Sequence, residues 1–228
     1  MAQGKKYQNA ARGYDREHLH SIDEAATIVA GFPKRNYDET VDMVLRLGVD
    51  PRKADEMIRG TVSLPAGTGK AVRVAVFAQG EAAQAARDAG AEFVGAEDLA
   101  EQVEGGMLDF DVTIAAPDMM PIVGKLGRVL GPRSLMPNPK TGTVTPDVAK
   151  AVEEFKGGKV EFRTDKFANV HVPVGKVSFS DADLTTNINS VVDEIKRLKP
   201  AGAKGIYIKK ASISSTMGPS VKIDVSGF

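Results

Sequence analysis

A glycine-rich segment that ends in lysine, Ala66-Gly-Thr-Gly-Lys70, is the first feature of this sequence that could do chemistry. Such a segment binds phosphate through backbone N–H groups when another glycine lies five positions before the last one and a hydroxyl residue follows the lysine. The sequence has Leu64 and Ala71 at these positions. The expected strand-to-helix turn at 78–81 also lacks the G-x-G-x-x-G pattern of dinucleotide sites. We therefore expect no nucleotide or other cofactor to be bound.

Histidines and closely spaced aspartates are the other residues that could ligate a metal or move a proton. The chain has three histidines, His18, His20 and His171, and no cysteine. We interpret the first two as surface residues, and Asp109-Phe-Asp111 as a loop edge before a buried strand rather than a cation site. The sequence also lacks the G-x-S-x-G turn of a serine nucleophile. We therefore predict neither a catalytic residue nor a metal site.

Two loops are more distinctive than these candidates. The segment from Gly124 to Pro146 holds four prolines, and it holds four cations without an acid up to Gly142. It is either a ligand-facing surface or a solvated loop between domains. The segment 214–219, Ser-Ser-Thr-Met-Gly-Pro, lies between two expected strands where a plain hairpin would have Asn-Gly or Asp-Gly. It is either a binding loop or a hairpin turn in which Gly218 supplies a positive φ.

The first 67 residues predict a helix, a strand, a short helix and a second strand. Ser21-Ile-Asp-Glu24 has the form of a capping box, which predicts a helix that ends at Gly31. Apolar residues alternate along 41–49, which is typical of a strand with one buried face. A short helix is expected from Asp50 to Gly60, followed by a strand over 61–65. These elements are too few to enclose a core alone.

Residues 68–158 have a different pattern, in which short apolar strands alternate with helices of about ten residues. The strands are expected at VRVAVF, AEFVG and DVTIAAP. A further helix is expected from Pro146 to Phe155, before a glycine pair at 157–158. This order is typical of a parallel sheet with helices on both faces, which is a three-layer α/β domain.

Residues 159–228 return to the pattern of the first segment, with about four strands and one long helix. The helix has an apolar stripe formed by Leu184, Ile188, Val191, Ile195 and Leu198. The two end segments together are large enough to enclose a core. The fold class is therefore α/β and α+β in two domains: a discontinuous α+β domain of residues 1–67 plus 159–228, and an inserted α/β domain of residues 68–158.

The composition is that of a globular protein and excludes fibrous and wholly disordered chains. The chain has 228 residues, 42% of them hydrophobic and 26% charged. It has neither a run of about 18 apolar residues nor an apolar signal sequence, so we expect no membrane span and no export. The 30 basic and 30 acidic residues give a net charge of zero, which argues at first sight against nucleic-acid binding. However, residues 159–228 hold 11 basic and 7 acidic residues, whereas 68–158 hold 9 and 13.

Five strings of this sequence resemble the family of bacterial large-subunit ribosomal protein number one. They are GTVSLP (60–65), KLGRVLGPRSLMPNPKTGTVTP (125–146), VGKVSF (174–179), KGIYIKK (204–210) and STMGP (215–219). The resemblance runs in register over nearly the whole chain. It implies a two-domain protein on the mobile ribosomal stalk beside the tRNA exit site, which holds folded ribosomal RNA through its first domain.

The resemblance also implies which residues face RNA. The family's Thr-Met-Gly triplet falls on Thr216, Met217 and Gly218, where a tight loop can approach riboses in the minor groove. The other matched RNA-facing positions are Tyr37, Thr40, Arg163, Lys166, His171, Lys176 and Ser178. The cations expected to face tRNA are Lys125, Arg128, Arg133 and Lys140.

Four sites depart from the family pattern. Asn36 stands where a basic residue is frequent, which removes one expected phosphate contact. Tyr37 stands where phenylalanine is usual, and its ring can still cover a ribose or base. Phe167-Ala168 replaces the usual glycine turn next to Lys166, and Ser134 replaces the usual glycine in the Pro-Arg-Gly-Leu motif. We expect local differences in backbone geometry at the last two positions.

The resemblance implies a nonenzymatic structural constituent of the large ribosomal subunit, located in the cytoplasm, monomeric within the ribosome and without a membrane partner. Its partners would be large-subunit ribosomal RNA of the stalk, exit-site tRNA whose release it assists, and its own operon messenger RNA. It would repress translation of that messenger RNA by binding an RNA structure similar to the one in the stalk. The alternative is an α/β enzyme that acts on a phosphorylated small molecule through residues 124–142. No acid, base or nucleophile accompanies that loop.

Overall fold

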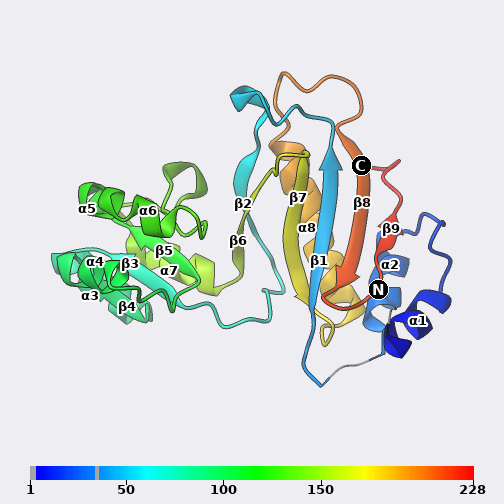
Figure 1. The fold of residues 1–228 in the computed structure, drawn as a ribbon, viewed down its shortest axis with the longest axis horizontal. Coiled ribbons are helices and arrows are strands. Elements are labelled where there is room, and N and C mark those ends of the chain that lie inside the picture. Colours follow the sequence, from blue (N-terminus) through cyan, green and yellow to red (C-terminus); the bar gives the residue numbers. More distant parts are fainter. Residues whose placement is uncertain (1–3, 34–35) are drawn as a thin grey trace. The chain divides into compact units, whose positions relative to one another are not determined.

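The computed structural model describes residues 4–33 and 36–228 and divides the chain into two compact units (Figure 1). The first unit is discontinuous and runs up to Gly69 and again over Val160–Phe228. The second unit is Lys70–Lys159. Each unit has its own buried apolar core. The insert therefore starts two residues and ends one residue later than the sequence predicts.

The first unit is built on a four-stranded antiparallel sheet of order β7-β1-β8-β9, with a separate two-stranded β2-β6 sheet. Its elements are α1 (Lys5–Arg12), α2 (Ile22–Ala30), β1 (Thr40–Leu47), the 3-10 turn η1 (Ala54–Glu56), β2 (Arg59–Ser63), β6 (Lys159–Arg163), β7 (Asn169–Lys176), α8 (Asp181–Arg197), β8 (Ile208–Ser215) and β9 (Val221–Ile223). The sequence does not predict α1, whose N-cap Gly4 offers no side-chain hydrogen bond.

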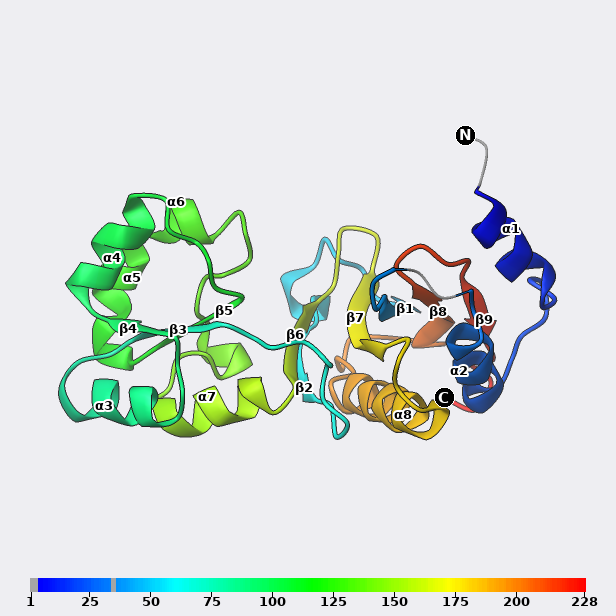
Figure 2. The same cartoon turned by 90° about the horizontal axis from the view of Figure 1, so that it is seen from below.

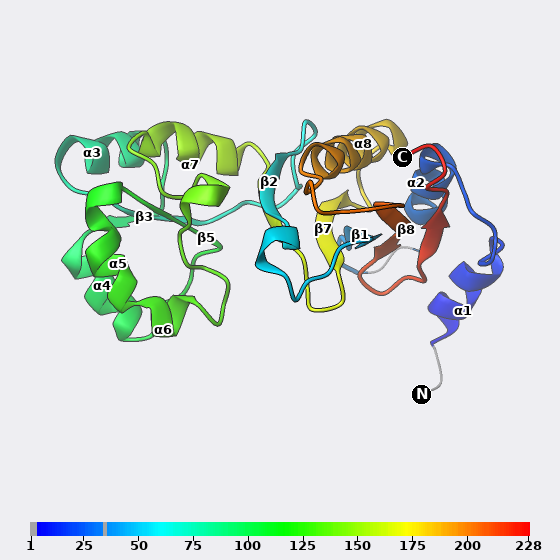
Figure 3. The same cartoon turned by 90° about the horizontal axis from the view of Figure 1, so that it is seen from above.

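The four-stranded sheet has one covered and one open face. Val41, Met43, Leu45 and Leu47 of β1 point into the core, so the predicted alternation is confirmed. Helices α2 and α8 lie along the covered face, whereas none of the described helices covers the other (Figures 2 and 3). The open face is therefore the surface on which polar side chains of β1, β7 and β8 gather.

Within the described residues no helix, including the 17-residue α8, is long and apolar enough to cross a membrane.

The local signals at the start of the chain have different outcomes. The capping box is confirmed, because the Ser21 side chain accepts from the Glu24 N–H and the Glu24 side chain accepts from the Ser21 N–H. The short helix predicted between Asp50 and Gly60 is wrong. The Glu56 carboxylate accepts from the Asp50 N–H and the Lys53 ammonium, which closes a compact turn of which only η1 is helical.

A buried asparagine on α8 holds the chain crossing that leads out of the first unit. Asn187 has none of its surface exposed. Its amide nitrogen donates to the carbonyls of Gly67 at 3.0 Å and Val174 at 2.8 Å, and its amide oxygen accepts from the Ala66 N–H at 3.1 Å. The side chain thus satisfies three backbone groups, of which the Val174 carbonyl is fully buried.

The second unit is a parallel sheet of order β4-β3-β5 between two helical layers, as predicted. Helices α3 and α7 lie on one face, and α4, α5 and α6 lie on the other (Figure 2). Its elements are β3 (Val74–Phe77), α3 (Gly80–Asp88), β4 (Phe93–Gly95), α4 (Glu97–Glu104), β5 (Val112–Ala115), η2 (Pro117–Met119), α5 (Met120–Lys125), α6 (Gly127–Leu130), η3 (Pro139–Thr141) and α7 (Val148–Lys156).

The segment from Gly124 to Pro146 is only partly a loop. It begins in α5 and α6, and Leu126 and Leu130 are buried in the core rather than exposed to a ligand. The expectation that this whole segment is a loop is therefore wrong, because these leucines are buried at the four-residue spacing of a helix. Ser134 adopts a positive φ of 59°, a conformation that glycine takes more easily.

Candidate nucleic-acid interface

The loop between β8 and β9 forms the centre of the candidate site. Both the N–H and the hydroxyl of Thr216 donate to the carbonyl of Thr40, at 3.0 Å and 3.2 Å. The side chain of Met217 next to it is 55% exposed. The predicted triplet therefore presents an exposed thioether on a backbone that is tied to the first residue of β1.

Gly218 is required for space and not for backbone conformation. The structure does not give it a positive φ, so the hairpin interpretation in which it supplies one is wrong. A Cβ atom at this position would collide with Ser215 Oγ and would lie 2.9 Å from Cδ2 of Phe32. Real Cβ atoms do not approach heavy atoms this closely, so any side chain here would displace the loop.

Glu39 positions this loop, and the sequence analysis missed it. The side chain is buried, and its Oε2 accepts from Ser215 Oγ at 2.7 Å and from the Met217 N–H at 2.9 Å. Hydrogen bonds to a carboxylate are stronger than those between neutral groups. An acid one residue before a strand carries no signal for such a role, because its partners lie about 176 residues away in the chain.

The end of β7 joins the same place. Lys176 pairs in register with Thr40 and donates from Nζ to its hydroxyl at 2.9 Å. The hydroxyl of Ser178 donates to Asp38 at 2.7 Å. A cavity of about 340 Å³ lies beside them, and the exposed Tyr37 is among its lining residues. Seven predicted residues thus come together: Tyr37, Thr40, Lys176, Ser178, Thr216, Met217 and Gly218.

His171 lies further along the open face of the sheet. It pairs across the strands with Val44, which in turn pairs with Ser212 of β8. The next row of this face includes Arg46 and Lys210, which pair with each other and are both exposed. Neither cation was predicted from the sequence as part of the site. Strand alternation placed Arg46 on the polar face, but only the register of β1 and β8 puts Lys210 beside it.

Arg163 and Lys166 do not join the cluster. Arg163 ends β6 beside the first residues of β7, since the next residue, Thr164, bridges to Val170, and Lys166 lies in the turn before Asn169. Seven residues along β7 separate Asn169 from Lys176, which at about 3.3 Å per residue is roughly 23 Å. The Lys166 ammonium lies 5.2 Å from the centroid of the Phe167 ring. Ala168 adopts the left-handed φ of 63° that a glycine turn would favour, so the turn forms without glycine.

The electrostatics of the open face are mixed. Asp42 lies between the Thr40 row and the His171 row of β1. Burial raises the pKa of Asp42 above its ordinary value, although His171 and Lys176 act in the opposite direction. Lys176 therefore offsets the charge of an acid that would otherwise repel phosphate groups.

The four cations predicted to face tRNA are exposed on the second unit. They are Lys125, Arg128, Arg133 and Lys140. Within residues 4–33 and 36–228 none of them forms an ion pair. Asn138 shapes the turn before the last of them, because its side chain accepts from the Lys140 N–H and its carbonyl accepts from the hydroxyls of Thr141 and Thr143.

The segment that resembled a phosphate loop is engaged within the protein. Lys70 donates to the Asp111 carboxylate at 2.7 Å, and Arg73 lies 3.4 Å from the other oxygen of the same group. Asp111 is thus held by two cations of the chain. This arrangement agrees with our interpretation of Asp109-Phe-Asp111 as a loop edge.

Comparison with known proteins places the chain in a family. The model of the ribosomal protein L1p/L10e family matches residues 28–219. The large ribosomal subunit protein uL1 of Cutibacterium acnes is 59% identical over 98% of this chain and 97% of its own length. The proteins of the same description from Nocardioides sp. and Thermobifida fusca are 57% and 55% identical over 98% of this chain, and the matches cover 93% and 95% of those proteins. This chain belongs to the ribosomal protein L1p/L10e family.

Proposed function

We propose that the chain is a structural, nonenzymatic constituent of the large ribosomal subunit in the cytoplasm, which binds folded ribosomal RNA of the stalk through the open face of its first unit. The observation that carries this proposal is the Thr216–Gly218 loop, tied by Thr40 and Glu39 and flanked by Lys176. The family membership supports the ribosomal assignment, since the relatives are described as large-subunit proteins.

The chemistry of this face suits double-stranded RNA. The wide minor groove of RNA displays 2′-hydroxyl groups and base edges, which proteins recognise by shape and by hydrogen bonds. A tight loop with an exposed thioether and a small hydroxyl fits against riboses. Arg46 and Lys210 lie on the same face and offer charge to phosphate groups, which positions RNA without reading its sequence.

Two kinds of substitution on this face should therefore fail differently. We expect Met217→Asp to weaken binding of a stalk ribosomal RNA fragment by roughly tenfold or more and binding of a scrambled RNA far less, because it removes a shape contact. Lys210→Ala should weaken both RNAs alike and reduce the salt slope by about 1. Fluorescence anisotropy at several salt concentrations measures both effects.

The matched control is Lys196→Ala on α8. Lys196 is exposed, but α8 packs on the covered face of the sheet (Figure 2). Its removal should change neither affinity. Equal losses from Met217→Asp and Lys210→Ala on both RNAs would contradict the division of roles, and unchanged binding in both variants would contradict the RNA-binding face itself.

We further propose that the second unit contacts tRNA that leaves the exit site. Lys125, Arg128, Arg133 and Lys140 offer charge to a phosphate backbone, and such contacts are weak enough to break during each cycle. The ten acids of residues 81–118 discourage this unit from binding nearby RNA permanently. The proposal rests on exposed charge and does not depend on the RNA face of the first unit.

Reversal of three of these charges tests the tRNA contact. With Arg128→Glu, Arg133→Glu and Lys140→Glu combined, we expect deacylated tRNA to leave reconstituted ribosomes roughly tenfold more slowly, because electrostatic attraction is replaced by repulsion. Stopped-flow fluorescence of labelled tRNA measures the rate. Lys150→Glu, an exposed reversal on α7, is the control. An unchanged rate with the triple variant incorporated would leave these cations without a role in tRNA release.

We also propose repression of the chain's own operon. A messenger RNA that displays a structure similar to the stalk would use the Thr216–Gly218 loop in the same way. One open face accommodates one such structure at a time, so ribosomal and messenger RNA would exclude each other. Free protein in excess of ribosomal RNA would then occupy the messenger.

A further inference from the structure

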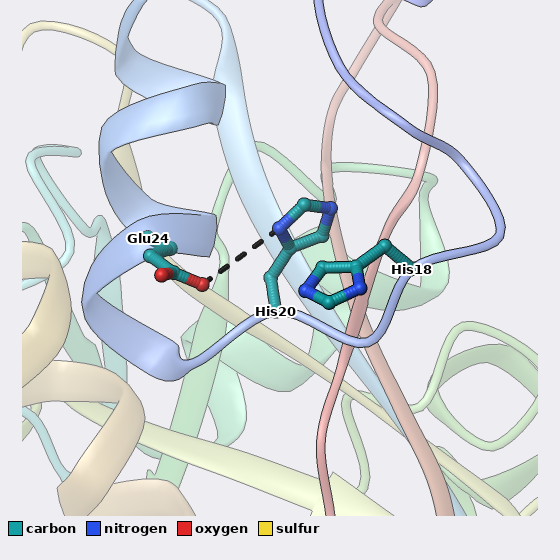
Figure 4. A group of neighbouring side chains, drawn as sticks. All are labelled: His18, His20 and Glu24. Carbon is teal, nitrogen blue, oxygen red and sulfur yellow. Dashed lines mark ion pairs between the residues drawn. The ribbon is translucent and has the colours of Figure 1, made fainter.

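Two histidines and a glutamate come together at the start of α2, outside the set of residues that form the RNA loop (Figure 4). One possible ligand atom from each of His18, His20 and Glu24 lies within 4.8 Å of the others. The expectation that both histidines are surface residues is wrong for His20, which is only 8% exposed. His18 is exposed, as expected.

His20 is held firmly by the edge of the sheet. Its N–H donates to the carbonyl of Lys222 at 3.0 Å, and its carbonyl accepts from the Asp224 N–H at 2.9 Å. His20 thereby forms a parallel bridge with Ile223, the last residue of β9. These bonds fix the backbone of His20, and burial of the residue restricts the positions of its imidazole before any ligand binds.

The hydrogen bonds of His20 determine which ring nitrogen carries the proton. Nε2 lies 3.1 Å from the backbone carbonyl of Asp15, and a carbonyl oxygen can only accept. In the neutral ring Nε2 therefore carries the hydrogen, and Nδ1 presents a lone pair. Metal-bound histidines usually donate their second ring N–H to a carbonyl or carboxylate in this way.

The lone pair of His20 faces a carboxylate. Nδ1 lies 3.8 Å from Oε2 of Glu24, and that oxygen already accepts from the Ser21 N–H. Two electron-rich atoms that face each other repel unless a positive charge lies between them. The ring of His18 adds a third donor, with its centroid 4.8 Å from that of His20 and the planes at 79°.

The charge around the cluster also favours a cation. Residues 13–24 contain four carboxylates and one guanidinium. One of the four, Glu17, is paired with Lys222 at 2.6 Å, so the local excess is reduced but not removed. Two imidazoles and one carboxylate form a donor set of the kind that binds zinc and similar divalent transition metals.

We propose that His18, His20 and Glu24 bind one divalent transition-metal cation of the zinc type. Ligand atoms around a tetrahedral zinc ion lie roughly 3.4 Å apart, so the exposed His18 side chain has to close on the other two. A water molecule completes the fourth position. The ion would tie the segment between α1 and α2 to the first turn of α2, and it would stabilise the first unit in proportion to its free concentration.

Zinc binding to the full chain, freed of metal with a chelator, tests this proposal. We expect one equivalent of zinc chloride to bind in isothermal titration calorimetry and to raise the temperature of unfolding. Cobalt chloride should give the intense visible absorption of a tetrahedral ion. His18→Asn and Glu24→Gln should each weaken zinc binding at least tenfold. Both variants should fold, since His18 is exposed and glutamine can keep the capping box.

His171→Asn is the matched control, because it removes the third histidine, which lies on the open face of the sheet. It should leave zinc affinity and the thermal shift unchanged. Equal zinc affinity in wild type and His18→Asn would overturn the proposal, as would absence of zinc binding at micromolar concentration. NMR spectra in which His20 stays doubly protonated at pH 7 with zinc present would also overturn it, since a proton would then occupy the place of the ion.

Discussion

Gly218→Val is expected to lower the affinity for a stalk ribosomal RNA fragment by roughly 30-fold or more, which corresponds to about 2 kcal/mol. The added side chain has no room, because even its Cβ would collide with Ser215 and lie 2.9 Å from Phe32. The loop must move, and the bonds from Met217 to Glu39 and from Thr216 to Thr40 are then lost or lengthened. Titration of labelled RNA measures the affinity.

The control for this prediction is the same substitution in the terminal segment. A Cβ at Gly227 would meet no atom within 4 Å, so Gly227→Val should bind RNA like the wild type. Thermal unfolding shows whether the Gly218 variant remains folded, and Gly218→Ala provides a smaller change in the same direction. Wild-type affinity in a folded Gly218→Val protein would show that the loop does not contact RNA.

Asn187→Leu is expected to lower the free energy of unfolding of the first unit by about 3 kcal/mol. Leucine has a similar size but leaves the carbonyls of Gly67 and Val174 and the N–H of Ala66 without their partner. Buried polar groups without hydrogen bonds are costly. All four tyrosines lie in the first unit and the chain has no tryptophan, so tyrosine fluorescence during urea unfolding reports on this unit alone.

Asn189→Leu is the matched control on the same helix. Asn189 is exposed, so the same substitution there leaves no buried group unpaired. Its free energy of unfolding should stay within about 0.5 kcal/mol of the wild-type value. Similar values for the two leucine variants would show that Asn187 does not hold the chain crossing.

Local chemistry made several elements predictable. The capping box at Ser21 works through groups three residues apart, and the alternation along β1 follows from the two-residue period of a strand. The parallel sheet of the second unit follows from short apolar strands separated by helices. The turn after Asp50 was not predictable from such signals. The sequence favoured a short helix there, but the Glu56 carboxylate accepts from the Asp50 N–H and closes a turn instead.

The candidate site was predictable only in part. Lys166 and Lys176 are near each other in sequence and both match RNA-facing positions of the family, but the extended strand β7 separates them. Lys210 is distant in sequence from Arg46, yet the register of β1 and β8 places the two side by side. Glu39 acquires its role only when the β8–β9 loop folds back on it.

The sequence by itself determined the family, the two-part architecture and the Thr-Met-Gly loop, because these depend on residue order, hydrophobic period and motifs that are contiguous in the chain. Only the tertiary structure decided that Gly218 is needed for space, that Glu39 holds the loop, and that His18, His20 and Glu24 lie close together. The physical reason is that these contacts depend on strand register and on backbone hydrogen bonds between distant segments. Such bonds form between generic N–H and C=O groups, which leave no mark on the identity of the residues that carry them.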